Sequence, residues 1–220
     1  MRALDLLLPE RCVVCERPGR ALCSECRDAL TRLVPPLCGR CGSPGPWPVR
    51  RCAECAGRRL AFVEARSAIV YDSQARVFLR GWKERGRRGL AREAARLVAE
   101  TIAKPRAVCL VPVPGDPERA RERGDVPARA LARELESLWE IPLLDGLERS
   151  RSLPRQRGLS LVERRRNVRG SVVARKEMQT HVCVVDDVYT SGATVDACAA
   201  ACRRFGARCV RVVTLARAVR

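Results

Sequence analysis

Two stretches of the chain, residues 108–113 and 182–185, are apolar without interruption and have the length of buried β-strands. Residues 65–71 and 209–215 have the composition of further strands. Apolar side chains recur at helical spacing between them, for example in residues 90–102. Buried strands separated by amphipathic helices are typical of a parallel sheet covered on both faces. We therefore predict an α/β fold, with ligands at the carboxyl ends of the strands.

The first 60 residues lack this periodicity and instead contain four Cys-x2-Cys pairs. The paired residues are Cys12, Cys15, Cys23, Cys26, Cys38, Cys41, Cys52 and Cys55. Two such pairs can hold one tetrahedral zinc ion, and no His is present here to replace a thiolate. We pair them sequentially, with Cys12 to Cys26 in one site and Cys38 to Cys55 in the other. Interleaved pairing and disulfides are the alternatives. The sequence predicts two structural zinc ions, because this segment has too little apolar surface to fold without metal.

This change of character predicts two domains, a zinc module over residues 1–60 and an α/β domain over residues 61–220. The net charge is +18, and nearly all the cations are Arg. Such a balance indicates a polyanionic partner, but an arginine-rich composition explains it equally well. No stretch is long and apolar enough to span a membrane, and residues 1–8 are too short and too acidic for a secretory signal. We expect a cytoplasmic protein.

The most specific motif follows the apolar strand of residues 182–185. It consists of an acid pair, a loop of small residues and the start of a helix: Asp186, Asp187, Val188, Tyr189, Thr190, Ser191, Gly192, Ala193 and Thr194. The loop lets backbone N–H groups approach a phosphate, and the helix adds unpaired donors at its N-terminus. Carboxylates would repel that phosphate, so the acid pair is expected to accept hydrogen bonds from a sugar diol. Because adjacent strand residues point to opposite faces, we expect the two carboxylates to differ in importance.

This motif resembles the signature of type I phosphoribosyltransferases. The resemblance implies that phosphoribosyl diphosphate is the ligand, bound with Mg²⁺. It implies that the residues from Thr190 to Thr194 hold the 5-phosphate, and that Asp186 and Asp187 hold the ribose hydroxyls. Lys83, Arg121 and Arg123 are candidates for neutralising the diphosphate; ordinary surface cations are the alternative.

A double zinc ribbon before such a domain resembles the ComF family of competence proteins. Further segments carry the resemblance over nearly the whole chain, including Val111-Pro112-Val113-Pro114 and the stretch from Gln156 to Gly170. One departure is Asp125-Val126-Pro127, where the family has Phe-Asn-Gln, so amide side chains expected near the diphosphate are missing. The resemblance implies a role in DNA uptake during natural transformation, or in the use of DNA as a nutrient.

Two other functions stay open: an active phosphoribosyltransferase in nucleotide salvage, and a nucleic-acid or protein adaptor with a vestigial transferase fold. Single-stranded DNA is an expected partner, because arginines crowd the segment before the acid pair. The candidates for DNA contact are Arg164, Arg165, Arg166 and Arg169. Neutralising several phosphates would make such binding electrostatic and sensitive to salt. DNA-uptake or recombination proteins are further candidate partners.

Overall fold

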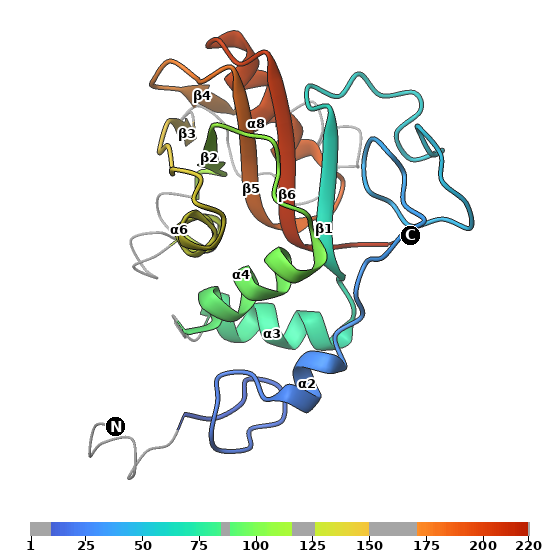
Figure 1. Cartoon of the computed structure of the whole chain (residues 1–220), viewed down its shortest axis with the longest axis vertical. Coiled ribbons are helices and arrows are strands. Elements are labelled where there is room, and N and C mark those ends of the chain that lie inside the picture. The colour runs from blue at the N-terminus through green and yellow to red at the C-terminus, as the bar shows by residue number, and fades with distance from the viewer. Residues whose placement is uncertain (1–9, 85–88, 116–125, 150–170, 220) are drawn as a thin grey trace.

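The computed structural model describes residues 10–84, 89–115, 126–149 and 171–219. In this part of the chain the main sheet has four parallel strands in the order β1-β6-β5-β2 (Figure 1). The strands are β1 (Glu64–Val70), β2 (Cys109–Pro112), β5 (His181–Tyr189) and β6 (Cys209–Arg217). A small antiparallel sheet pairs β3 (Leu147–Arg149) with β4 (Val172–Ala174). The predicted parallel-sheet α/β fold is confirmed.

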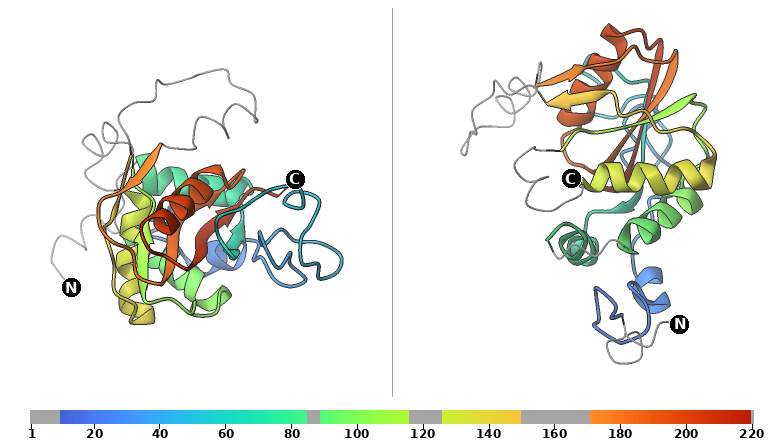
Figure 2. Two further views of the ribbon diagram at one scale, coloured as in Figure 1. Left: turned by 90° about the horizontal axis from the view of Figure 1, so that it is seen from above. Right: turned by 90° about the vertical axis from the view of Figure 1, so that its left-hand side faces the viewer.

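Helices cover both faces of the main sheet (Figure 2). One face carries α3 (Ser73–Glu84), α4 (Gly89–Thr101) and α6 (Pro127–Trp139), and the other carries α8 (Ala193–Arg204). Cys183 and Val185 of β5 belong to the core beneath the first group, whereas Val182 and Val184 belong to the core beneath α8. This alternation explains the uninterrupted apolar run in β5, because both of its faces are buried.

The strand that carries the acid pair is longer than we predicted. β5 continues beyond residue 185 to Tyr189, because its pairing with β6 continues from Asp186, opposite Thr214, to Tyr189, opposite Arg217. On the other side, the pairing of β5 with β2 ends where Val185 lies opposite Pro112. The acid pair therefore stands where β5 loses its neighbour β2, at the carboxyl ends of the strands, and this is where α/β sheets bind ligands.

The cysteine-rich segment folds as two parts, which we call the first ribbon (residues 10–30) and the second ribbon (residues 38–59). The first contains the short helix α2 (Ser24–Asp28) and packs against α3 and α4. The second lies beside β1 and shares a core with α8 (Figure 1). Between them the chain runs along β1, with the N–H of Leu33 bonded to the carbonyl of Ala68 at 2.9 Å. Among the described helices, none has the length and apolar character that crossing a membrane requires.

Candidate zinc sites and sugar-phosphate site

The eight paired cysteines form two groups of four, and in each group the sulfur atoms lie within 4.8 Å of one another. The groups are Cys12, Cys15, Cys23, Cys26 and Cys38, Cys41, Cys52, Cys55. Sulfur–sulfur distances include 3.7 Å for Cys15 to Cys23 and 3.7 Å for Cys38 to Cys55. A zinc ion with Zn–S bonds of about 2.3 Å places its ligands ~3.8 Å apart, so both groups fit a tetrahedral zinc site. The grouping is the sequential one, and all of these thiols are free of disulfides.

Backbone amides favour the thiolate form at the first cysteine of each group. Burial by itself would raise the pKa of Cys12, but N–H groups including those of Cys15 and Cys23 outweigh it and lower the pKa to about 6. At Cys38 burial is likewise outweighed, chiefly by the N–H groups of Cys41 and Cys52, and the pKa falls to about 6. Zinc binds thiolates, so this donor arrangement suits the metal. The structure thus has two four-cysteine sites that fit structural zinc.

The two carboxylates of the acid pair line one cavity of about 250 Å³ at the carboxyl edge of the sheet. Thr194 of α8 lines it from one side, and Gly115 and Val126 from another. Arg149 at the end of β3 also lines the cavity, and its Nε donates a 3.0 Å hydrogen bond to the carbonyl of Pro114. Acidic, hydroxyl and guanidinium groups therefore converge on a space that adjoins the N-terminus of a helix.

Asp186 and Asp187 have different surroundings. The Asp187 carboxylate is 2.7 Å from the ammonium of Lys83 on α3, so the two charges compensate each other. Asp186 accepts a 2.9 Å hydrogen bond from the N–H of Asp187. Burial, reinforced by the charge of Asp187, raises the pKa of Asp186 to about 8. The neutral form of Asp186 is thereby favoured over its charged form, compared with an exposed carboxyl group.

The small-residue loop joins β5 to α8 as the sequence predicts. Gly192 has φ of 71° and is the N-cap of α8, and a Cβ atom there would overlap the hydroxyl of Tyr189. Only glycine meets both conditions without strain. Ser191 accepts a 3.3 Å hydrogen bond from the N–H of Ala193 through its hydroxyl, while Thr190 is exposed. The loop and the first turn of α8 therefore stand beside the acid pair.

The structure places the remaining predicted site residues as follows. Lys83 lies against Asp187, so its first partner is a carboxylate of the same site. Two diphosphate candidates, Arg121 and Arg123, lie outside the described residues, as do the four candidates for DNA contact (Arg164, Arg165, Arg166 and Arg169). Sequence reasoning gave no role in this site to Arg149, which lines the cavity, to Arg58, which bonds to the carbonyl of Ser191, or to Arg217, which lies against the ring of Tyr189. No local motif marks these three, because each reaches its partners only through the tertiary fold.

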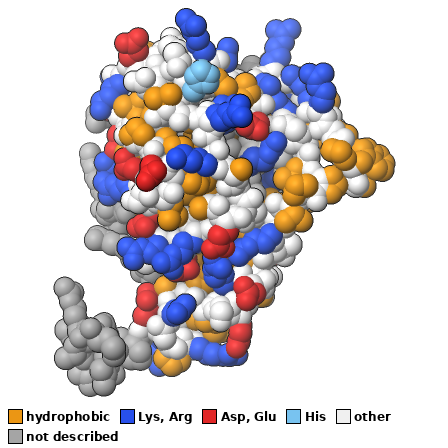
Figure 3. Space-filling model, viewed as in Figure 1, with side chains coloured by type: hydrophobic (Ala, Val, Ile, Leu, Met, Phe, Trp, Pro, Cys, Tyr) orange, Lys and Arg blue, Asp and Glu red, His pale blue; other side chains and the backbone are white. Residues whose placement is uncertain are grey.

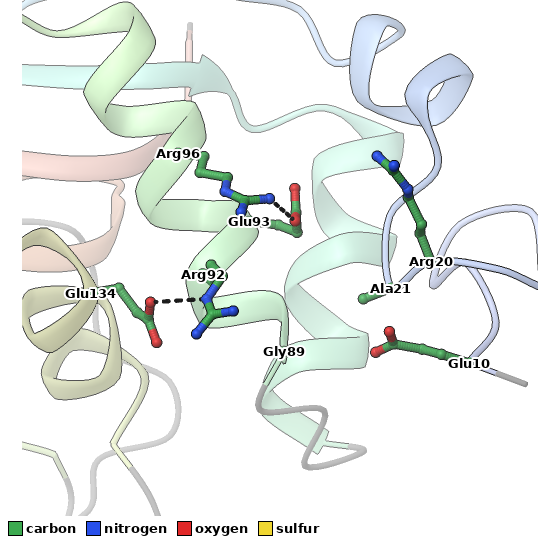
Figure 4. A pocket seen from close by; sticks show the side chains of 8 residues that line it. All are labelled: Glu10, Arg20, Ala21, Gly89, Arg92, Glu93, Arg96 and Glu134. Atoms are coloured by element: carbon green, nitrogen blue, oxygen red, sulfur yellow. Dashed lines mark hydrogen bonds and ion pairs between the residues drawn. The ribbon is translucent and has the colours of Figure 1, made fainter. Parts of the chain in front are cut away.

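A larger cavity, of about 540 Å³, lies between the first ribbon, α4 and α6 (Figure 4). Four of its charged side chains form ion pairs: Arg92 lies 3.5 Å from Glu134, and Arg96 lies 3.0 Å from Glu93. Arg20 and Glu10 of the first ribbon line the opposite side (Figure 4). Nothing among the residues that line it repeats the convergence of hydroxyls and carboxylates on a helix N-terminus, so the smaller cavity is the better candidate for chemistry.

Fold and sites together define a double zinc ribbon joined to a parallel-sheet α/β domain. Residues 3–58 match the double zinc ribbon domain family. The chain is 26% identical to competence protein F of Haemophilus influenzae, over 94% of this chain and 97% of that protein. It is 28% identical to the DNA utilization protein YhgH of Escherichia coli K12, over 96% of this chain and 99% of that protein. It is 26% identical to competence protein ComFC of Bacillus subtilis, over 88% of this chain and 79% of that protein. The chain is homologous to these competence and DNA utilization proteins over most of its length, which confirms the resemblance drawn from its motifs.

Proposed function

We propose that the cavity beside Asp186 and Asp187 binds phosphoribosyl diphosphate. The observation that supports this most directly is the convergence of both carboxylates and Thr194 on one cavity beside the N-terminus of α8. The loop amides and hydroxyls would hold the 5-phosphate, and the carboxyl groups would accept hydrogen bonds from the ribose diol. The raised pKa of Asp186 favours its neutral form, and this lessens the repulsion of a phosphorylated ligand.

Mg²⁺ would enter with the ligand in this proposal. Diphosphate oxygens are its main ligands in sites of this kind, and one or two carboxylates complete them. Asp187 and Asp186 supply carboxylate oxygens at the cavity. The metal would neutralise the diphosphate and stabilise it as a leaving group, should a base or amine be transferred to the sugar. Arg149 supplies a cation at the same cavity.

Isothermal titration calorimetry with phosphoribosyl diphosphate, with and without Mg²⁺, tests the ligand. Asp186→Asn and Asp187→Asn should each cost ~1–3 kcal/mol of binding free energy, because part of the acceptor capacity becomes donor. Asp28→Asn, an exposed acid of the first ribbon, is the matched control and should bind like the unaltered protein. Binding unchanged in both cavity variants would refute the assignment. Diphosphate release measured across a set of bases would separate a transferase from a protein that only binds the ligand.

A role that involves DNA is suggested by the names of the relatives, independently of the ligand. Because they include competence and DNA utilization proteins, we propose that this chain acts in DNA uptake or utilisation. Growth on DNA as the nutrient, or transformation frequency, measured in a strain that lacks the protein and again after complementation, tests this role. Complementation by the Asp187→Asn variant would show that the role does not need the sugar-phosphate site.

A second proposed activity is binding of single-stranded DNA at the tip of the second ribbon. Trp47 there is 66% exposed, and Figure 3 shows that hydrophobic side chains gather on a projection of this face of the molecule. Arg50 and Arg51 follow Trp47 on the same loop and are exposed. An exposed aromatic ring beside cations suits a nucleic-acid strand, since bases stack on the ring and phosphates meet the charges. This adds a stacking contact to the electrostatic binding expected from the arginines of residues 164–169.

Tryptophan fluorescence can test that surface directly. Trp82 and Trp139 are 6% and 5% exposed, so a change on adding oligothymidine reports mainly on Trp47. We expect quenching that weakens steeply between low and moderate salt, and that is lost in Trp47→Ala. Arg50→Glu with Arg51→Glu should weaken binding, whereas Arg175→Glu, at an exposed position just after β4, should change it little. Oligonucleotide binding without any change in fluorescence would place the DNA elsewhere.

A further inference from the structure

The second ribbon is bonded to the loop that we propose holds the phosphate. The guanidinium of Arg58 donates a 2.8 Å hydrogen bond to the carbonyl of Ser191. Just beyond the ribbon, the N–H of Ala61 donates a 2.7 Å hydrogen bond to the side chain of Asp196 in the first turn of α8. The loop and the helix that follows it are thus fixed from outside the strand–loop–helix unit to which they belong.

Arg217, at the end of β6, makes a second connection between the zinc site and this loop. Its side chain is fully buried. It donates a 2.8 Å hydrogen bond to the carbonyl of the zinc ligand Cys41 and lies 2.6 Å from the carboxylate of Glu54. On its other side the guanidinium lies 4.4 Å from the ring centre of Tyr189. The Tyr189 ring in turn lies directly beneath Gly192, where a Cβ atom would overlap the tyrosine hydroxyl.

A buried guanidinium is tolerated only while its partners remain in place, because an unpaired buried charge is strongly destabilising. Two polar partners of Arg217, the carbonyl of Cys41 and the carboxylate of Glu54, belong to the second ribbon. Cys41 is itself one of the four zinc ligands. This ribbon has few apolar side chains of its own to fix its fold, so the metal holds these partners in position. Losing the metal would therefore disturb the surroundings of Arg217 and Tyr189.

The first ribbon is connected to a different part of the molecule. Arg27 bonds to Glu100 at 2.5 Å, and Arg27 lies 4.0 Å from Glu93, both on α4. Val13 packs against Gly81 of α3. These contacts act on the helices of the opposite face of the sheet from α8.

We propose that the second zinc ribbon positions the phosphate loop, so that the shape of residues 189–196 depends on zinc in the Cys38–Cys55 site and not on zinc in the first site. The ribbon does so through Arg58, through the partners of Arg217, and through Tyr189 beneath Gly192. In this arrangement Arg58 and Arg217 are positioning residues. The dependence of the loop on zinc is argued from the geometry alone. The expected effect of the ribbon on the affinity for phosphoribosyl diphosphate rests on the proposed function.

Hydrogen–deuterium exchange of the ligand-free protein, read at peptides covering residues 189–196, tests the positioning directly. Cys52→Ser in the second site and Cys23→Ser in the first form a matched pair, because both cysteines are half-buried zinc ligands. We expect ~10-fold faster exchange in the loop for Cys52→Ser, and less than about 2-fold change for Cys23→Ser. Equal acceleration in the two variants would overturn the proposal, since zinc would then act only through overall stability.

Replacing a cysteine could accelerate exchange simply by unfolding the ribbon. A second set of variants therefore keeps all eight cysteines. Arg58→Ala removes the bond to Ser191, and Arg59→Ala removes an exposed neighbour as its control. Glu54→Gln removes the charge that faces Arg217. Loop exchange should accelerate several-fold in Arg58→Ala and Glu54→Gln and stay unchanged in Arg59→Ala. Unchanged exchange in both Arg58→Ala and Glu54→Gln would overturn the proposal.

Calorimetric affinity for phosphoribosyl diphosphate provides the second readout. Arg58→Ala and Cys52→Ser should weaken binding ~10-fold, while Arg59→Ala should leave it unchanged. If the unaltered protein fails to bind, the proposed function is wrong, and the exchange data still decide whether the ribbon positions the loop. If it binds and Arg58→Ala binds equally well, the proposed function stands and the positioning proposal fails.

Discussion

The two zinc ribbons have the same ligand set but different relations to the domain that they accompany. In the first, Cys15 is exposed and Cys23 and Cys26 are half-buried. In the second, Cys38, Cys41 and Cys55 are each 1% exposed. The first lies on the outer side of α3 and α4, whereas the second shares a core with α8, β5 and β6. Both ribbons thus join a core of the domain, on opposite faces of the sheet, but the thiols of the first are on the whole more exposed than those of the second.

The two ribbons also contact different sides of the candidate sugar-phosphate site. Lys83, which compensates Asp187, lies on α3, the helix against which the first ribbon packs. Arg58 and the partners of Arg217 lie in the second ribbon and reach the phosphate loop. We propose a boundary near residue 60, which separates zinc module from α/β domain along the chain. Across that boundary, the second ribbon is joined to the domain by a buried charge, and the first by apolar and surface contacts.

Equivalent cysteines allow the sharpest test of this contrast. Cys12 and Cys38 are both buried, and each is the first ligand of its site. Cys38→Ser should lower the free energy of unfolding by ~4 kcal/mol or more, because the loss of the site also leaves Arg217 without fixed partners. The corresponding fall in Tm is about 8–16 °C. Cys12→Ser should lower the free energy of unfolding by about half as much as Cys38→Ser.

Elemental analysis of the same two variants is the accompanying measurement. The unaltered protein should carry two zinc ions, and each variant should lose only the ion of its own site. An equal fall in Tm in the two variants would show that the two ribbons contribute equally to the stability of the domain.

A glycine on α3 gives a test of how the first ribbon packs. A Cβ atom at Gly81 would overlap a methyl group of Val13. Gly81→Ala favours the helix by ~1 kcal/mol, but the overlap costs ~1–3 kcal/mol, so we expect a net loss of stability of ~1 kcal/mol. Adding Val13→Ala removes the obstructing methyl groups, so the double variant should be more stable than the sum of the single changes predicts. If the changes in the free energy of unfolding by urea are additive, Val13 of the first ribbon does not crowd position 81 of α3.

Much of this arrangement could be predicted from local sequence, because its determinants are short-range. The Cys-x2-Cys pairs defined both metal sites, since two thiolates on one turn already half-complete a tetrahedron. The uninterrupted apolar run before Asp186 predicted a strand buried on both faces. Gly192 marked the turn into α8, where its positive φ excludes side chains.

Other features depend on tertiary packing and had no local signal. The strand β5 continues to Tyr189 because β6 continues beside it, which the polar acid pair gave no reason to expect. Arg217 is one arginine among many in the sequence, yet it is fully buried because Glu54 and the carbonyl of Cys41, both distant in the chain, converge on it. The exposure of Trp47 likewise depends on which face the second ribbon turns to the domain.

The last effect that we expect is a pH dependence, and it concerns Asp186, the member of the acid pair that does not form the 2.7 Å ion pair with Lys83. Burial and the charge of Asp187 raise the pKa of Asp186 from 3.8 to about 8. Between these values the folded protein holds a proton that the unfolded chain has released, so the free energy of unfolding falls as the pH rises towards 8. Asp186→Asn cannot ionise and escapes this loss. The Tm difference between Asp186→Asn and the unaltered protein should therefore shift in favour of the variant as the pH rises from 5 to 8, whereas Asp28→Asn should give a difference that does not change with pH. A difference for Asp186→Asn that does not change with pH would mean that Asp186 is already ionised in the folded protein, and that the acid pair meets its ligand with both charges in place.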